Sequence, residues 1–402
     1  MHPGAGNRVI LLRILTINSG SSSIKFQLFD GEEPLLRGIC DAIGLENSGI
    51  SLEKPDNKDE PPEKEEKRIP NHETALKEIL NSVKSFCDLS SISAVAHRVV
   101  HGGEAMREPI VVGTHELEEI RKLNNLAPLH NPHNILGIET MMKLLPSVKN
   151  IAVFDTAFHS TLPEEAFLYA LPYEFYKEKK IRKYGFHGTS HAFVSKEAAR
   201  ILGSQKARII TCHLGNGASI AAVKEGKSID TSMGMTPLEG LAMGTRSGDT
   251  DPAVVLSIAK DIGSPEAADK LLNKQSGLLG LSGISSDMRI LHENESQEGA
   301  KRAMSVFSYR IVKYIGAYTA AMNGVDAIAF TGGIGENAWY IREKVLQHFA
   351  FLGLQLDPEK NKRSEQEISA PGSSVRVLVI STNEELEMAR EAAAMLASPE
   401  SP

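Results

Sequence analysis

The chain has 402 residues, 41% of them hydrophobic and 24% charged, and a formal net charge of −7 at pH 7. A globular chain of this length exceeds the size at which a single hydrophobic core stops growing, so two domains are expected. The negative charge, which no long basic run offsets, argues against nucleic acid or an anionic membrane surface as a partner.

The first apolar run, residues 9–17, is expected to be a buried strand. Arg13 interrupts it, and it is far shorter than the ~18 apolar residues that span a bilayer, so it predicts neither a signal peptide nor a membrane helix. The segment 54–71 is rich in charge and proline, and we expect it to be solvated. Three widely spaced cysteines predict a cytoplasmic protein without disulfides.

Further along the chain, strand-like apolar runs alternate with amphipathic helical patterns. Strands are expected at 93–99, 148–154, 207–212, 327–330 and 375–380. Helices are expected at 74–86, 115–126, 252–260, 299–322, 338–351 and 384–396. This alternation is typical of an α/β protein.

Three glycine-rich loops each follow an apolar run: NSGSSSIK at 18–25, HLGNGAS at 213–219 and TGGIGEN at 331–337. Glycine allows the backbone to approach a ligand and to turn its N–H groups toward an anion. Together the loops predict a nucleotide-using phosphotransferase, although each one alone is also compatible with a plain turn. None has the spacing of a P-loop or a Rossmann fingerprint. A helix that points its N-terminus at an anion is expected to begin near Glu336.

The first two loops share an order of strand, small-residue turn and strand. Ser23-Ile24 matches Ser219-Ile220 at the start of the second strand. The match predicts two halves of similar fold, each with one phosphate-binding hairpin, unless it arose by chance.

Three arginines lie outside the expected helices. They are Arg98, Arg246 and Arg289. A guanidinium group suits carboxylate and phosphate, so these side chains are candidate anion ligands. No cysteine or carboxylate completes a zinc set around the histidines. His187 is therefore expected to donate a hydrogen bond to a ligand, whereas His159 and His191 fit hydrogen-bonded core histidines.

Two carboxylates follow expected strands. Asp155 closes the run 151–154, at the end of a strand where α/β proteins usually collect their chemistry, although a turn-forming role fits it too. Glu384 opens a helix, where glutamate is common as a partner of the helix dipole, and it could instead bind the Mg²⁺ that accompanies a nucleotide.

Taken together, these motifs resemble the acetate kinase family over nearly the whole chain. Besides the loops, the match includes HRVVHGG at 97–103, APLHNP at 127–132, FDTAFH at 154–159, YGFHGTSH at 184–191, GTRSGDTDP at 244–252 and TNEE at 382–385. The resemblance implies an α/β fold of two duplicated actin-like, ribonuclease H-like domains around a central cleft. It implies domains at 1–157, with a helix at 388–402 packing back on the first, and at 158–387, and it implies a homodimer.

The resemblance also implies reversible phosphoryl transfer from ATP to acetate, giving acetyl phosphate and ADP, with Mg²⁺ or alternatively Mn²⁺. The implied catalytic residues are Asp155, His187 and Arg246, and the implied metal ligands are Asn18 and Glu384. The implied acetate site consists of Arg98, Val100, Leu129, His130, Phe186 and Pro237. The implied nucleotide site consists of Lys25, His213, Leu214, Gly215, Asn216, Gly217, Asp287, Met288, Arg289, Gly333, Ile334, Gly335, Glu336 and Asn337.

The chemistry of the acceptor agrees with these assignments. A carboxylic acid with a pKa of roughly 4.3 is ionised at neutral pH, so it needs no general base. Asp155 is therefore expected to orient the metal or an arginine, while a direct catalytic role stays open. The alternatives are a kinase for propionate or butyrate, and a non-catalytic ATP-dependent interaction module of the same superfamily.

Overall fold

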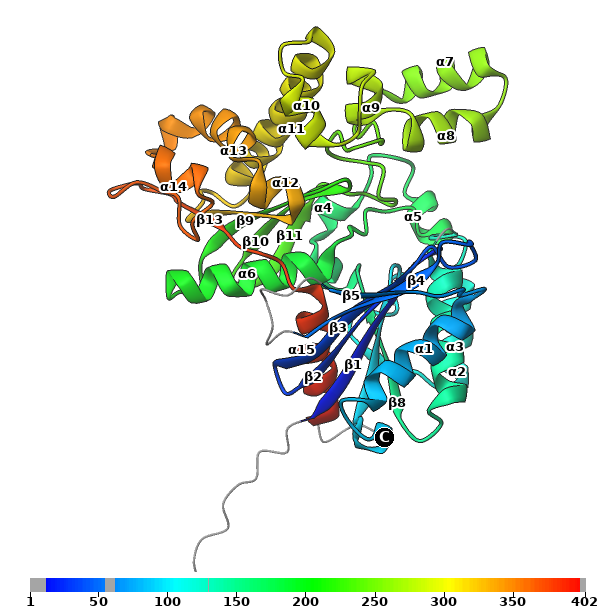
Figure 1. The fold of residues 1–402 in the computed structure, drawn as a ribbon. Helices are drawn as coiled ribbons and strands as arrows, with labels where there is room; N and C mark the ends of the chain where they lie inside the picture. The colour runs from blue at the N-terminus through cyan, green and yellow to red at the C-terminus, as the bar shows by residue number, and fades with distance from the viewer. Residues whose placement is uncertain (1–11, 55–61, 129, 398–402) are drawn as a thin grey trace, which may run out of the picture. The chain divides into compact units, whose positions relative to one another are not determined.

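The computed structural model describes residues 12–54, 62–128 and 130–397, which form two compact units (Figure 1). Within these residues, unit 1 comprises 12–157 and 384–397, and unit 2 comprises 158–383. The chain therefore leaves unit 1 after Ala157 and returns to it at Glu384. None of the helices in the described ranges is long and apolar enough to cross a bilayer.

Unit 1 is built on a mixed sheet with the strand order β5-β4-β3-β2-β1-β6-β8-β7. The strands are β1 (Arg13–Ser19), β2 (Ile24–Asp30), β3 (Glu33–Asp41), β4 (Gly49–Glu53), β5 (Glu63–Glu66), β6 (Ala94–Val99), β7 (Ile110–Val111) and β8 (Lys149–Phe154). Its helices are α1 (His72–Lys84), α2 (Thr114–Lys122), α3 (Asn131–Leu144) and α15 (Glu384–Ala397), with a 3₁₀ turn at Leu89–Ser91. The strands β1, β6 and β8 are parallel to one another.

Alternate residues of β1 and β6 face opposite sides of this sheet, as the period of a strand requires. Leu15 and Val95 join the cluster that α1 and α3 cover, whereas Ile14 and Ala94 join the cluster that α15 covers. Helix α15 therefore completes unit 1 from a distant part of the sequence.

Unit 2 is built on a second mixed sheet with the strand order β11-β10-β9-β12-β13. The strands are β9 (Arg208–Leu214), β10 (Ala218–Lys224), β11 (Lys227–Thr231), β12 (Ala327–Thr331) and β13 (Arg376–Val379). The helices are α4 (Glu164–Phe167), α5 (Glu174–Lys179), α6 (Gly188–Leu202), α7 (Pro252–Ile262), α8 (Pro265–Lys274), α9 (Gly277–Ser282), α10 (Met288–Glu293), α11 (Glu298–Ala321), α12 (Gly332–Asn337), α13 (Trp339–Leu346) and α14 (Pro358–Lys362), with 3₁₀ turns at Ala157–Thr161 and Gln347–Leu352. Helix α6 packs against β9 and β12, and α11 packs against β9 and β10.

The two sheets repeat one topology, which confirms the predicted duplication. The order β3-β2-β1-β6-β8 of unit 1 corresponds to β11-β10-β9-β12-β13 of unit 2, and the pairs are antiparallel, antiparallel, parallel and parallel in both. One glycine-rich hairpin loop joins β1 to β2, and the other joins β9 to β10. The register differs slightly from the sequence match, because Ile24 pairs with Ser19 whereas Ala218, rather than Ile220, pairs with the corresponding Leu214.

Two local predictions need correction. The helix expected near Glu336 already begins at Gly332, so most of the third glycine-rich loop is the short helix α12. The helix expected at 338–351 ends at Leu346 and continues only as a 3₁₀ turn. In the charged segment, residues 55–61 lie outside the described ranges. Its remainder includes β5, an edge strand that pairs with β4 through its backbone while every side chain is exposed, as expected for a charged sheet edge.

Candidate active site

In unit 1, the functional candidates gather at the carboxyl ends of parallel strands. Asn18 lies near the end of β1, Arg98 near the end of β6, and Asp155 directly after β8. The register pairs Ile17 with His97 and Arg98 with Val153, so these three side chains lie along one edge of the sheet. Helix α15 begins at Glu384 beside the same edge.

Arg98 and Asp155 form a two-point ion pair. Arg98 Nε donates to Asp155 Oδ1 at 2.8 Å, and Arg98 Nη2 donates to Oδ2 at 2.7 Å. The side chain of Asp155 is only 2% exposed. Arg98 Nη1 lies 3.9 Å from Glu384 Oε2. Burial alone would lower the pKa of Arg98, but the negative charges of Asp155, Glu384 and Glu385 raise it above its ordinary value, so the group is cationic.

Glu384 has the electrostatics of a cation ligand. Burial raises its pKa, the positive charges of Arg98 and Lys25 lower it, and the negative charge of Asp155 raises it further, with a net increase. The carboxylates of Asp155 and Glu384 thus lie next to two cationic side chains, those of Arg98 and Lys25. Carboxylate oxygens are ligands by which proteins bind Mg²⁺.

Two buried asparagines, which sequence patterns did not single out, fix the segment that carries Val100. Asn134 accepts a hydrogen bond from the Val100 N–H at 3.1 Å and donates to the Ser19 carbonyl at 2.8 Å. Asn131 exchanges two 3.1 Å hydrogen bonds with the backbone of His101. Both asparagines belong to α3. Asn134 ties the candidate acetate residue Val100 to the end of β1.

The structure does not show the other predicted acetate-site residues next to Val100. His130 is exposed and precedes α3, while Leu129 lies outside the described residues. Phe186, which is buried, and Pro237 belong to unit 2.

In unit 2, two predicted residues surround Gly217 at the β9–β10 turn. A Cβ atom at Gly217 would lie 3.5 Å from Arg246 Nη1 and 3.5 Å from both Cε1 and Nε2 of His187. The His187 ring lies 4.3 Å from that of His213, and its Nδ1 shares a 2.9 Å hydrogen bond with Ser219 Oγ. His187 precedes α6 with φ of +56°, a left-handed conformation that is costly for a residue with a side chain.

Arg246 is a half-buried cation without an acidic partner among the residues that the structure describes. Its Nη1 donates to the Pro237 carbonyl at 3.3 Å and lies 3.6 Å from Met243 Sδ. Burial lowers the pKa of Arg246 below its ordinary value. A guanidinium group with only neutral partners is suited to an incoming anion.

The other nucleotide candidates form three groups. Residues 213–217 end β9 and form its turn, where the Asn216 carbonyl accepts from Gly244 N–H at 2.9 Å. In α12, Glu336 accepts from Gly332 N–H at 2.9 Å and from Ser381 Oγ at 2.7 Å, so its own carboxylate occupies a donor at the helix start.

The third group is residues 287–289. Its Arg289 was expected to lie outside the helices, but it belongs to one. Arg289 lies in the first turn of α10 with its side chain 84% exposed, and its Nη2 donates to the capping residue Asp287 at 2.6 Å. The carbonyl of the intervening Met288 accepts from Tyr340 Oη at 3.2 Å.

His159 and His191 are buried and hydrogen-bonded, as predicted. His159 shares hydrogen bonds with Ser228 Oγ at 2.8 Å and with the Phe186 carbonyl at 3.1 Å, and burial lowers its pKa to about 4. His191 bonds to Ser219 Oγ at 2.7 Å, so it supports the same serine that contacts His187.

The structure therefore shows an α/β protein of two compact units. Unit 1 carries Arg98 with its two carboxylate partners, and unit 2 carries Arg246 and His187 around Gly217. Comparison with known proteins narrows this class. The model of the Acetokinase family matches residues 13–390. The acetate kinase of Thermotoga maritima is 54% identical over 397 residues, which cover 94% of this chain and 98% of that protein.

Two crystal structures are similar in fold over almost their whole length. Acetate kinase from Porphyromonas gingivalis has a TM-score of 0.89 and 43% identity, with 96% of this chain and 100% of that chain covered. A propionate kinase from Francisella tularensis subsp. tularensis SCHU S4 has a TM-score of 0.89 and 42% identity, with 95% and 99% covered. The chain belongs to the acetokinase family, and the predicted two-domain actin-like α/β fold is confirmed.

Proposed function

We propose that this chain is an Mg²⁺-dependent phosphotransferase that transfers the γ-phosphoryl group of ATP to acetate, reversibly, giving acetyl phosphate and ADP. The observation that carries the proposal is Arg246, a half-buried guanidinium group that lies with His187 around Gly217 and has no acidic partner among the described residues. Membership of the acetokinase family supplies the acceptor.

The main obstacle to this reaction is the approach of two anions. Acetate, with a pKa of roughly 4.3, is already ionised at neutral pH and needs no base. We assign Arg98 to the acetate carboxylate and Arg246 with His187 to the transferring phosphoryl group, where positive charge stabilises the transition state. The two-point pair with Asp155 supports an orienting role for that carboxylate, since it holds the Arg98 guanidinium group in one position.

Asn18 and Glu384 would hold Mg²⁺, which neutralises charge on the phosphates of ATP when it is bound. We assign the phosphates to residues 213–217 and to Lys25, the ribose to residues 287–289, and the adenosine to residues 333–337. Backbone N–H groups of glycine-rich turns suit such contacts.

The rate of ADP formation with and without acids tests this function. We expect ADP to form with ATP, Mg²⁺ and acetate, more slowly with propionate, and at a low basal rate without an acid. ADP formation that does not respond to any short acid would indicate an ATP-dependent interaction module instead.

A propionate kinase is the second candidate, because one of the two similar crystal structures carries that name. Replacing Val100 with alanine is expected to raise the kcat/KM ratio of propionate to acetate by about ten-fold, since removing methyl groups enlarges an acyl pocket. The ratio is measured by competition between the two acids. Val112→Ala, which removes the same atoms from the buried core of unit 1, serves as control and should leave the ratio unchanged. A ratio unaffected by Val100→Ala would remove Val100 from the acyl pocket.

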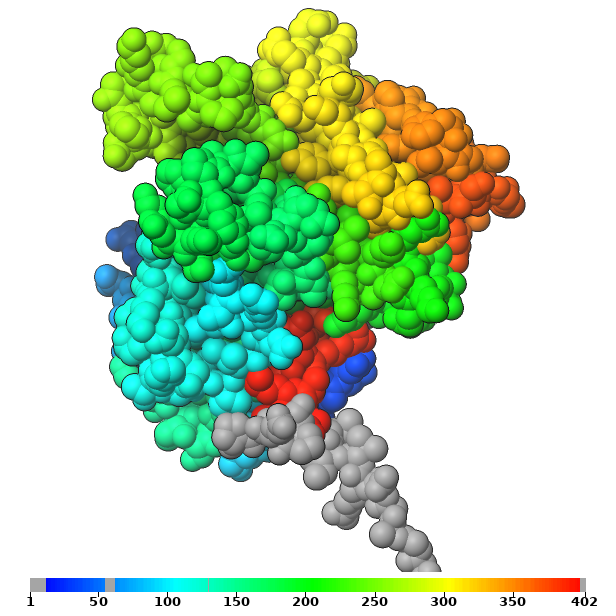
Figure 2. Space-filling model, turned by 180° about the vertical axis from the view of Figure 1, so that it is seen from behind, coloured from blue at the N-terminus to red at the C-terminus, as the bar shows by residue number. Residues whose placement is uncertain are grey.

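We also propose that two copies of the chain associate through α7. This helix is rich in apolar residues, yet none of them is buried, and Leu256 is 71% exposed. Helices α7 and α8 project from the rest of unit 2 (Figure 2). An apolar helix surface of this kind usually has a partner. Light scattering should give twice the 43.7 kDa of one chain, and Leu256→Glu should shift the mass toward the monomer. A monomeric wild-type protein would contradict this assignment.

We place the activity in the cytoplasm. ATP and ADP are its proposed substrates, and Cys40, Cys87 and Cys212 are free thiols, as expected in a reducing compartment.

A further inference from the structure

The segment 232–251, which joins β11 to α7, carries both Pro237 and Arg246 and has no helix or strand along its length. Irregular connections of this length are uncommon in compact domains and are usually functional. Much of the segment is buried, including Leu241 and Met243, so its backbone groups need hydrogen-bond partners within the protein. The side chains that supply those partners determine where the segment lies.

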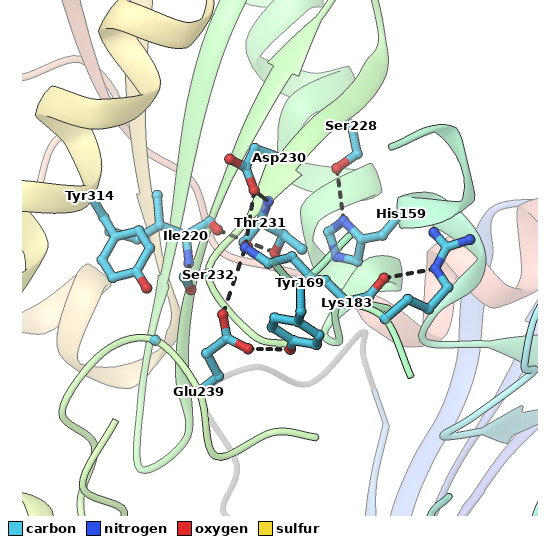
Figure 3. Close-up of polar contacts among 12 residues, drawn as sticks. His159, Tyr169, Lys183, Ile220, Ser228, Asp230, Thr231, Ser232, Glu239 and Tyr314 are labelled. Atoms are coloured by element: carbon cyan, nitrogen blue, oxygen red, sulfur yellow. Dashed lines mark hydrogen bonds and ion pairs between the residues drawn. The ribbon is translucent and has the colours of Figure 1, made fainter. Parts of the chain in front are cut away.

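One hydroxyl group, that of Tyr169, holds the segment on both sides of Pro237. Tyr169 Oη accepts a hydrogen bond from Met235 N–H at 2.9 Å. The same hydroxyl group donates to the carboxylate of Glu239 (Figure 3). Residues 235 and 239 are thus tied to the same atom. The Pro237 carbonyl between them is the group that accepts from Arg246 Nη1 at 3.3 Å. The phenol therefore fixes the turn on which the Arg246 guanidinium group rests.

The same contact reaches the segment that carries His187. The Gly234 carbonyl accepts hydrogen bonds from the N–H groups of Tyr184 and Gly185, both at 3.1 Å. A Cβ atom at Gly234 would overlap both the Glu239 carboxylate and Tyr169 Oη, so the pair packs directly over this glycine. Tyr169 and Glu239 thus lie where the segments bearing Arg246 and His187 meet.

Lys183 lies beside the other carboxylate oxygen of Glu239 and is itself held by the end of β11 (Figure 3). Lys183 Nζ lies 3.9 Å from Glu239 Oε1, 3.3 Å from Asp230 Oδ1 and 2.9 Å from the Thr231 carbonyl oxygen. The carboxylate of Glu239 is therefore fixed between a phenol and an ammonium group. Among the described residues, neither Tyr169 nor Glu239 forms a hydrogen bond or an ion pair with the Gly217 turn. Their effect on that turn therefore passes through the backbone of segment 232–251.

A second set of hydrogen bonds, made by Asp249, holds the part of the segment that carries Arg246. Asp249 accepts from Gly240 N–H at 2.8 Å, and its own N–H donates to the Gly240 carbonyl at 2.9 Å. Tyr314 Oη donates to the other carboxylate oxygen of Asp249 at 2.7 Å. The tip between these residues is a turn in which Met243 N–H donates to the Arg246 carbonyl at 3.0 Å. A tyrosine–carboxylate pair thus holds each end of the arginine-bearing segment.

We propose that Tyr169 and Glu239 are positioning residues for phosphoryl transfer, which act by fixing the turn at Pro237 and, through it, the guanidinium group of Arg246. This inference rests on the proposed function. It predicts that breaking the pair lowers the rate of the chemical step while leaving nucleotide binding nearly unchanged, because the phosphate loops on β9 and α12 keep their own hydrogen bonds. A group that acts only in the transition state affects kcat rather than KM.

Steady-state kinetics of three variants test the proposal. Tyr169→Phe is expected to lower kcat by about 10- to 100-fold, with the KM for ATP within about two-fold, since a misplacement of about 1 Å can cost 100-fold in rate. Glu239→Leu should lower kcat by a similar factor and likewise leave the KM for ATP nearly unchanged. Glu239→Gln, whose amide oxygen still accepts from the Tyr169 hydroxyl, should keep kcat within about three-fold. Tyr173→Phe serves as control, because it removes a hydroxyl group from an exposed ring four residues further along the chain. Its kcat should equal that of the wild type.

The outcomes separate the two claims. A wild-type protein without acetate-dependent turnover refutes the proposed function and this inference with it. With an active wild type, unchanged kcat in Tyr169→Phe and Glu239→Leu overturns the inference alone. So does a Glu239→Gln variant as slow as Glu239→Leu, or a loss that appears mainly in the KM for ATP. If Tyr169→Phe does not fold, the comparison of Glu239→Gln with Glu239→Leu, each checked by circular dichroism, decides the question.

Discussion

Replacing Arg246 with alanine is expected to lower kcat by about 10³- to 10⁵-fold, the range for an arginine that stabilises a transferring phosphoryl group. The fold should be little affected. Among the described residues, Arg246 donates to the Pro237 carbonyl and to Met243 Sδ and to no carboxylate, so its removal leaves no buried carboxylate of these ranges unpaired. Turnover measured with saturating ATP and acetate, together with a thermal unfolding curve, checks both parts of the prediction.

The control is Arg363→Ala, which removes an arginine of the same unit whose side chain is 64% exposed. Its kcat should equal that of the wild type. An Arg246→Ala enzyme within ten-fold of the wild type would remove Arg246 from the reaction, and a large loss of thermal stability would mean that its main role is structural.

Replacing Arg98 with alanine is expected to abolish turnover and also to destabilise unit 1. Asp155, whose side chain is 2% exposed, and Glu384 would lose the guanidinium group that neutralises them. Removing one partner of a buried ion pair typically costs about 3–5 kcal/mol. Chemical denaturation of the variant gives the change in the free energy of unfolding, and the kinetic assay gives the loss of turnover.

A double variant separates these two effects. Combining Arg98→Ala with Asp155→Asn removes the unpaired negative charge that the single variant leaves on Asp155. The double variant should therefore recover part of the lost stability while staying inactive. If the single variant were as stable as the wild type, the pair would not have the energetic role that its geometry indicates. If the double variant recovered activity, Arg98 would not bind the acetate carboxylate.

Much of the fold could be predicted because its strands are short apolar runs bounded by turns. The duplicated hairpins at Gly20 and Gly215 were visible for the same reason, since both place glycine directly after a strand. Helix α6 was not predicted. Its first two turns, from Gly188 to Ser195, are buried on all sides, so no polar face alternates with an apolar one. Strand β5 was missed because its pairing uses only backbone groups, whereas its side chains are those of a solvated segment.

Sequence patterns also predicted only part of the candidate site. Arg98, His187 and Arg246 stand out because they interrupt motifs with glycine and histidine. The residues that hold them do not, because their partners are distant in sequence. Asn134 reaches Ser19 across 115 positions, and Tyr169 reaches Glu239 across 70. Such pairs depend on how the strands are ordered, which no local pattern shows.

Trapping the product with hydroxylamine tests the central claim most directly, because an acyl phosphate gives an acyl hydroxamate whereas hydrolysed ATP does not. With ATP, Mg²⁺ and acetate, the wild-type protein should form acetyl hydroxamate in an amount equal to the ADP released, and Arg98→Ala and Arg246→Ala should form almost none. ADP released without hydroxamate from acetate, propionate or butyrate would contradict phosphoryl transfer to a carboxylate.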